Sequence, residues 1–192
     1  DEFAVEEDIR MKEKMNAGKV TIVSLGPDRA IESIRTALAM GADDAVHVND
    51  GAYYDKADPY ATAQVLAAAI KGLTYDAVFL GKQAIDDDCG QVPAMLGELL
   101  GLPVVTQVIK LDVAADKKSA TVTREIEGGQ MVLDVPLPAV LSAQKGLNEP
   151  RYASLPGIMK AKKKPVDVKN AGGLGVSTGP MTVVKEMSLP PA

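Results

Sequence analysis

The spacing of apolar residues along the first hundred positions switches between a helical period and the short continuous runs typical of buried strands. Each expected helix ends at a glycine, and the third begins with Asp58 before Pro59, a pair that favours a helix start. The helices are expected over residues 1–17, 31–41, 59–72 and 93–101, and the strands over residues 20–24, 45–48 and 75–80. This alternation predicts an α/β fold with a mainly parallel sheet, helices on both faces and right-handed crossovers.

The pattern changes from Val104 onward. Extended segments are expected over residues 105–113, 120–126 and 131–135, and they predict an antiparallel extension of the same sheet. After Pro165 there is little periodicity, because glycine-rich and proline-rich stretches interrupt the chain. We therefore expect one domain over residues 1–164 and then an extended C-terminal arm, residues 165–192, which has no core of its own and lies on a partner.

The loop after the strand at 75–80 is the first candidate site. The strand ends at Gly81, a polar loop follows, and a helix begins near Pro93. The first N–H groups of a helix have no partner within the helix, and the helix dipole adds positive potential there, so anionic nucleotides bind at such positions. In α/β folds ligands bind at the carboxyl ends of strands, which is where this loop is expected to lie.

Individual residues of this loop narrow its chemistry. Lys82 lacks the Gly-Lys-Ser/Thr order of a P-loop, which disfavours nucleotide hydrolysis. The run Asp86–Asp88 has no histidine or further carboxylate at metal-binding spacing, so we interpret it as capping the helix around a phosphate held by the backbone. Cys89 is interpreted as a small packed side chain rather than as a reactive thiol.

Composition narrows the class of protein further. The chain has 192 residues, of which 46% are apolar and 24% charged, as is ordinary for a globular protein. Its net charge of −5 argues against nucleic-acid binding through bulk charge, and no apolar run approaches the ~18 residues of a membrane span. Its single cysteine excludes an internal disulfide. The chain begins without methionine, so we expect a segment before Asp1.

Four segments of the chain resemble one known family, the β subunit of electron transfer flavoproteins. The nucleotide loop of that family is similar to residues 81–88. The other matching segments are residues 34–43, residues 122–129 with 137–140, and residues 147–156 with the basic run at 158–164. The resemblance covers most of the chain to about Lys169. It implies a Rossmann-like sheet of the adenine nucleotide hydrolase-like type.

The resemblance also implies an electron carrier without catalytic residues of its own. The family's β subunit pairs with an α subunit that holds most of a redox-active FAD, and the β subunit itself binds AMP in a structural role. The heterodimer accepts electrons from acyl-CoA and other dehydrogenases, as in fatty acid oxidation, and passes them to a membrane quinone oxidoreductase. The implied compartment is the bacterial cytoplasm or the mitochondrial matrix.

Carried over to this sequence, the resemblance implies two sets of residues. The AMP site maps to Asp1, Leu25, Gly81, Lys82, Gln83, Ala84, Ile85, Asp86, Asp87, Asp88, Cys89, Gly90, Gln91 and Val92. Partner contacts map to Glu125, Pro150, Arg151, Tyr152, Ala153, Ser154, Leu155, Pro156, Gly157, Ile158 and Met159. Glu125 is expected to face the α subunit and the flavin, and Leu155 is the expected apolar anchor for dehydrogenases. The lysines at 160 and 162–164 are expected to form a basic rim around this anchor.

Departures from the family pattern leave alternatives open. The family's first strand and an Asn-Pro-Phe stretch before Asp1 are absent, so we expect the chain to be incomplete at its N-terminus. Gly90 and Val92 stand where some members have polar residues, which leaves backbone donors to hold a phosphate. One alternative is a bifurcating relative in which a second FAD replaces AMP. Another is a stand-alone nucleotide sensor that forms a homodimer.

Overall fold

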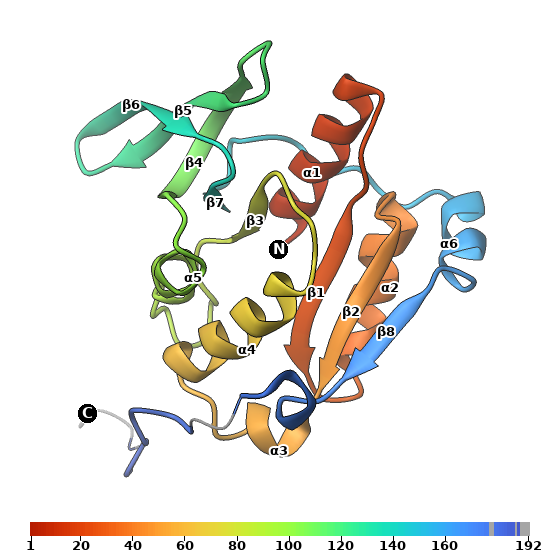
Figure 1. Ribbon diagram of the computed structural model, residues 1–192, viewed down its shortest axis with the longest axis vertical. Coiled ribbons are helices and arrows are strands. Elements are labelled where there is room, and N and C mark those ends of the chain that lie inside the picture. The colour runs from red at the N-terminus through yellow and green to blue at the C-terminus, as the bar shows by residue number, and fades with distance from the viewer. Residues whose placement is uncertain (177–178, 187, 189–192) are drawn as a thin grey trace.

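The computed structural model describes residues 1–176, 179–186 and 188, and Figure 1 shows how their helices and strands are arranged. The α-helices are α1 (Glu2–Met15), α2 (Ala30–Met40), α3 (Gly51–Tyr54), α4 (Pro59–Lys71), α5 (Val92–Leu100) and α6 (Leu155–Ala161), and the 3₁₀ turn η1 is Gly172–Leu174. The strands are β1 (Thr21–Gly26), β2 (Asp44–Asn49), β3 (Val78–Gly81), β4 (Val104–Val113), β5 (Ser119–Ile126), β6 (Gly129–Pro136), β7 (Val140–Ala143) and β8 (Val166–Lys169). Each helix and strand expected from the sequence is present.

The strands form two sheets. In the first, β1, β2 and β8 are all parallel. In the second, whose order is β3-β7-β4-β5-β6, the first three strands are parallel and β4, β5 and β6 form an antiparallel meander. The predicted α/β fold with its antiparallel extension is thus confirmed, although the strands divide between two sheets.

The division between the sheets lies between β1 and β3. In the part of the chain that the structure describes, β1 pairs only with β2 and β3 pairs only with β7, so each has one unpaired edge. A cavity of about 670 Å³ lies between them, lined by apolar side chains of both strands and by residues of α1 and α4. Sequence periodicity shows that a segment is extended but not which strand it pairs with, so this separation was not predicted.

Helices cover both faces of the first sheet because alternate residues of β1 point to opposite sides. Ile22 joins a core cluster with residues of α1 and α2, whereas Val23 and Leu25 join another with residues of α4. Asp58 caps α4 as predicted, because its carboxylate accepts a hydrogen bond from the Ala61 N–H at 2.8 Å.

The chain after Pro165 differs from the sequence expectation. Residues Val166–Lys169 form β8, which pairs in parallel with β2, and Ala171 is buried in the cluster beneath α4. Residues 166–171 therefore complete a hydrophobic core, whereas the sequence predicted an arm without a core. Beyond η1, the described residues 175–176, 179–186 and 188 form no helix or strand, and Met181, Val183 and Val184 among them are exposed. The proline pair at 190–191 lies outside the described residues.

Candidate functional site

The loop between β3 and α5, residues 82–91, is largely exposed at the carboxyl end of β3. Gly90 has a φ of 60°, which a glycine adopts without steric cost. The N-cap residue of α5 is Gln91, and its side chain makes no capping hydrogen bond. Within the described chain, the backbone N–H groups of Gly90, Gln91 and Val92 donate to no protein acceptor. The helix thus begins with free donors, as an anion site requires.

The aspartates of the loop do not cap α5, so that interpretation of the sequence was wrong. Asp86 accepts a hydrogen bond from the Asp87 N–H at 3.0 Å, and Asp87 accepts one from the Cys89 N–H at 3.0 Å. Asp88 accepts a hydrogen bond from the Gln83 amide. Such short-range bonds are the usual alternative for aspartate in turns, and they leave the helix donors unoccupied.

Cys89 also differs from its interpretation, because it is exposed rather than packed. Its pKa is raised by desolvation of the thiol and by the charges of Asp87 and Asp88. A raised pKa lowers the thiolate fraction, so the reactive alternative is not favoured either.

Two predicted residues outside the loop lie in or beside the carboxyl ends of strands. Asp1 contacts the start of the loop, since a Cβ placed on Gly81 would be 2.9 Å from the Asp1 Cβ. Asp1 also accepts a hydrogen bond from the Ala4 N–H at 2.9 Å and thereby caps α1. Leu25 lies at the carboxyl end of β1, where it lines a cavity of about 310 Å³ together with Arg29. The predicted nucleotide residues therefore gather at the ends of β1 and β3.

The predicted dehydrogenase-docking residues lie on and beside α6, which packs against α2 at the edge of the molecule (Figure 1). Tyr152 is 99% exposed and Leu155 is 79% exposed, and Met159 is exposed beside them. Ser154 caps the helix by accepting a hydrogen bond from the Gly157 N–H at 3.1 Å. These residues form one exposed apolar surface.

The four lysines expected to form a basic rim do not behave alike. Lys160, Lys162 and Lys163 are exposed. The Lys164 ammonium instead donates hydrogen bonds to the carbonyl oxygens of Leu38, at 2.9 Å, and Ala42. Those carbonyls lie at the C-terminus of α2, where a cation is favourable. Three of the four lysines are therefore free to form the expected rim, whereas Lys164 has a structural role.

Glu125 lies far from α6, on the β5–β6 hairpin of the second sheet (Figure 1). Its carboxylate accepts a hydrogen bond from the Gln144 amide at 2.9 Å. Met131 and Val132 on the neighbouring β6 are exposed. The structure thus separates the predicted partner residues into two surfaces.

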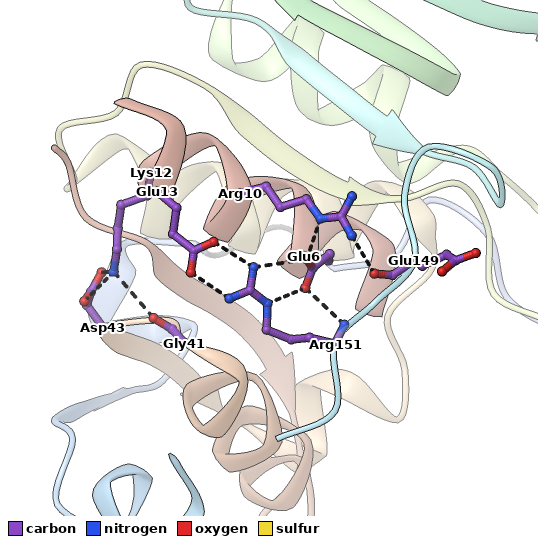
Figure 2. Close-up of polar contacts among 8 residues, drawn as sticks. All are labelled: Glu6, Arg10, Lys12, Glu13, Gly41, Asp43, Glu149 and Arg151. Carbon is purple, nitrogen blue, oxygen red and sulfur yellow. Dashed lines mark hydrogen bonds and ion pairs between the residues drawn. The ribbon is translucent and has the colours of Figure 1, made fainter. Parts of the chain in front are cut away.

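Sequence reasoning missed a group of charged residues on α1. Glu6, Arg10 and Glu13 lie one and two helical turns apart on one face. Figure 2 shows that the two glutamates bind Arg151 and that Arg10 binds the carbonyl oxygen of Glu149, two positions before it. Their spacing of four and seven positions was the available signal. It could not reveal the partner, which lies 145 positions from Glu6 in the sequence.

Two further features are absent from the residues that the structure describes. Among these residues, no group of three or more histidine, cysteine, aspartate or glutamate side chains is placed to hold a metal ion. No helix there combines the length and apolar character needed to cross a membrane.

The parallel strands and the helices that connect and cover them define the class: an α/β protein with a Rossmann-like fold. Residues 1–172 match the family model described as the electron transfer flavoprotein domain. The chain belongs to the family of electron transfer flavoprotein β subunits. This membership makes it part of an electron-carrying flavoprotein in which an α subunit is the partner.

Similar proteins come from distant organisms. The chain is 47% identical over 191 residues to the electron transfer flavoprotein subunit beta of Mus musculus, covering 99% of this chain and 74% of that protein. It is 45% identical over 192 residues to the subunit beta of Syntrophomonas wolfei, covering 100% of this chain and 73% of that protein. It is 43% identical over 190 residues to the mitochondrial subunit beta of Arabidopsis thaliana, covering 99% of this chain and 74% of that protein. These relatives include mitochondrial and bacterial proteins.

Proposed function

We propose that this β subunit binds AMP structurally at the β3–α5 loop and contributes to an electron-carrying heterodimer without catalytic residues of its own. The observation that carries the proposal is the N-terminus of α5, where the N–H groups of Gly90, Gln91 and Val92 have no acceptor among the residues that the structure describes. A phosphate placed there would accept these hydrogen bonds and meet the positive end of the helix dipole.

The residues around the loop favour a structural nucleotide over a reacting one. The sequence Gly81-Lys82-Gln83 lacks the hydroxyl residue that a P-loop places after its lysine to hold a metal ion. The one histidine, His47, is buried, and its Nε2 lies 3.2 Å from the Gly26 carbonyl oxygen. Neither the residues at 81–83 nor His47 are arranged to activate water for attack on a phosphate at α5.

We infer that the second sheet and the C-terminal arm of this chain contact the α subunit, which holds most of the FAD. The hairpin that carries Glu125 also exposes Met131 and Val132, and the arm exposes Met181 and Val183. Exposed apolar side chains of this kind are typical of a permanent subunit interface. Glu125 thus helps to shape the flavin site from the β-subunit side.

We infer that the surface around Leu155 binds acyl-CoA and related dehydrogenases. An apolar anchor within a basic rim suits partners with acidic surfaces, because the anchor supplies affinity and the charges speed association. Electrons would then pass from the flavin to a quinone oxidoreductase. The compartment would be the bacterial cytoplasm or the mitochondrial matrix.

We also propose that residues 1–164 form a nucleotide-binding domain that one more parallel strand, which these residues do not supply, completes between β1 and β3. The unpaired edges of these strands and the cavity between them support this proposal. Asp1 lies beside Gly81 at the carboxyl end of β3, where a strand leading into α1 would end. Residues 165–192 then supply β8 to the sheet and an arm to the partner subunit.

Substitution of Gln91 tests the AMP site. Gln91→Asp places a carboxylate at the N-cap of α5, where its negative charge repels a phosphate bound at the helix N-terminus. We expect the AMP content of the purified heterodimer to fall roughly tenfold. Gln91→Asn has the same shape without the charge and should keep most of the AMP. The FAD content of both variants, which reports assembly with the α subunit, should not change.

Released nucleotide is quantified by chromatography after denaturation. Equal AMP in wild type and Gln91→Asp would contradict a phosphate at this helix terminus. Equal loss in both variants would show that the Gln91 side chain, and not the charge at the helix terminus, determines binding, which also contradicts the proposal.

A further inference from the structure

The segment that leads into α6 is attached to α1 by four charged residues, Glu6, Arg10, Glu13 and Arg151, which we call the α1 clamp (Figure 2). The Arg151 guanidinium donates to Glu6 through Nε at 2.9 Å and through Nη2 at 3.1 Å. It also donates to both carboxylate oxygens of Glu13, at 2.7 and 2.9 Å. One side chain thus joins two turns of α1.

Further hydrogen bonds fix the backbone of the same segment. The Arg151 N–H donates to Glu6 at 3.2 Å, and Arg10 donates to the Glu149 carbonyl oxygen at 2.9 Å. Asn148 donates to the Phe3 carbonyl oxygen at 3.0 Å. The chain from Asn148 to Arg151 is therefore held along α1 before it reaches the docking surface.

Burial explains why an arginine is needed here. The Glu6 side chain is only 2% exposed. Burial raises the pKa of Glu6, but the hydrogen bonds from Arg151 and Arg10 outweigh it and hold the pKa below its usual value. A planar guanidinium can bind two carboxylates at once, whereas a lysine ammonium at this position has no fork to do so.

The clamp ends where the exposed apolar surface begins. Tyr152 follows Arg151 directly, and Leu155 opens α6 three positions later. The other end of α6 is also fixed, because Arg35 donates to the carbonyl oxygens of Ala161, at 2.6 Å, and Lys164, at 2.7 Å. The apolar side chains therefore lie between two anchored points of the backbone.

We propose that Arg151 is a positioning residue for the docking surface, one that acts through Glu6 and Glu13 and not by touching the dehydrogenase. This inference rests on the proposed docking function of the α6 surface. Ordering the segment in advance removes the entropy cost of ordering it on binding, so it raises affinity without adding a contact. The rate of electron transfer within the formed complex does not depend on this ordering by Arg151.

Steady-state electron transfer from an acyl-CoA dehydrogenase to the purified heterodimer tests the proposal. Arg151→Lys keeps the charge but loses the fork, and we expect the KM for the heterodimer to rise about five- to tenfold while kcat stays within about twofold. FAD and AMP contents should equal those of wild type. Hydrogen exchange of residues 148–161 should become faster.

Glu13→Gln provides a second variant in case Arg151→Lys does not fold. Glu13 is 53% exposed, so its loss leaves the buried Glu6 pair in place. Removing a negative charge near a basic docking rim should by simple electrostatics lower KM for an acidic partner. The clamp predicts the opposite, a rise in KM of about twofold or more. Glu2→Gln makes the same charge change on α1 outside the clamp and should leave KM no higher than in wild type.

The outcomes separate this inference from the function on which it rests. A wild-type heterodimer that accepts no electrons from the dehydrogenase would overturn the docking function itself. Normal wild-type transfer with an unchanged KM in both clamp variants would overturn only the positioning role. A fall in kcat accompanied by loss of FAD would also overturn it, because Arg151 would then support the whole assembly.

Discussion

Gly157 lies so close to α2 that a Cβ placed on it would be 2.5 Å from the carbonyl oxygen of Ala39. The obstacle is backbone, so it cannot move aside as a flexible side chain can. We predict that Gly157→Ala displaces α6 and lowers the free energy of unfolding by about 1–3 kcal/mol. Urea unfolding followed by circular dichroism measures the change.

Gly129→Ala is the matched control for this substitution. A Cβ at Gly129 would have no neighbour within 4 Å. Its effect on the free energy of unfolding should stay within about 0.5 kcal/mol. Equal losses in the two variants would mean that α6 is not packed closely on α2.

Asp8 on α1 should make the stability of the protein depend on pH. Burial, and secondarily the charge of Glu7, raises the pKa of Asp8 to about 7. The folded state therefore binds this proton more tightly than the unfolded state, so the stabilisation is complete below about pH 4 and is lost as the pH rises through 7. Asp8→Asn, which is neutral at every pH, removes this loss.

Urea unfolding at pH 5 and pH 8 measures the effect of Asp8. The wild-type free energy of unfolding should fall more than that of Asp8→Asn, by about 2–3 kcal/mol at ~1.4 kcal/mol per pKa unit. The range starts at pH 5 because hydrogen bonds and ion pairs lower the pKa of Glu6, Glu13 and Asp43, whose contributions are lost only at lower pH. Identical pH dependence in wild type, Asp8→Asn and the exposed Asp55→Asn would contradict the prediction.

Removal of the charge of two adjacent lysines should affect different properties, stability for Lys164 and the rate of association for Lys163. Lys164→Gln removes the cation from the C-terminus of α2, and we expect the free energy of unfolding to fall by about 1–2 kcal/mol. Lys163→Gln should leave stability unchanged but slow association with an acidic dehydrogenase at low ionic strength. Urea unfolding and stopped-flow mixing at two salt concentrations measure the two effects. If Lys163→Gln destabilised the chain as much as Lys164→Gln, the structural role of Lys164 would be wrong.

The features predicted correctly from the sequence are those that local chemistry determines. Asp58 before Pro59 is sufficient to start α4, and Gly101 ends α5 with a φ of 68° that glycine tolerates. The run Asp86–Asp88 shows the limit of such reasoning. Its turn-forming tendency was recognisable, but which N–H groups it would bind depended on the path of the loop.

The features that were missed depend on contacts between distant segments. Strand β8 has only four residues, so its pairing with β2 stabilises it more than any pattern of its own. Glu6 is a charge on a helix whose burial becomes tolerable only when Arg151 reaches it. Lys164 belongs to a basic run in the sequence, yet its ammonium binds a carbonyl oxygen at the C-terminus of α2.

The nucleotide content of the purified heterodimer tests the central claim most directly. After co-expression with the α subunit and denaturation, the released nucleotides are identified by mass and quantified by absorbance. The account predicts one AMP and one FAD for each heterodimer. Two FAD without AMP, or a stable homodimer that binds no α subunit, would contradict it.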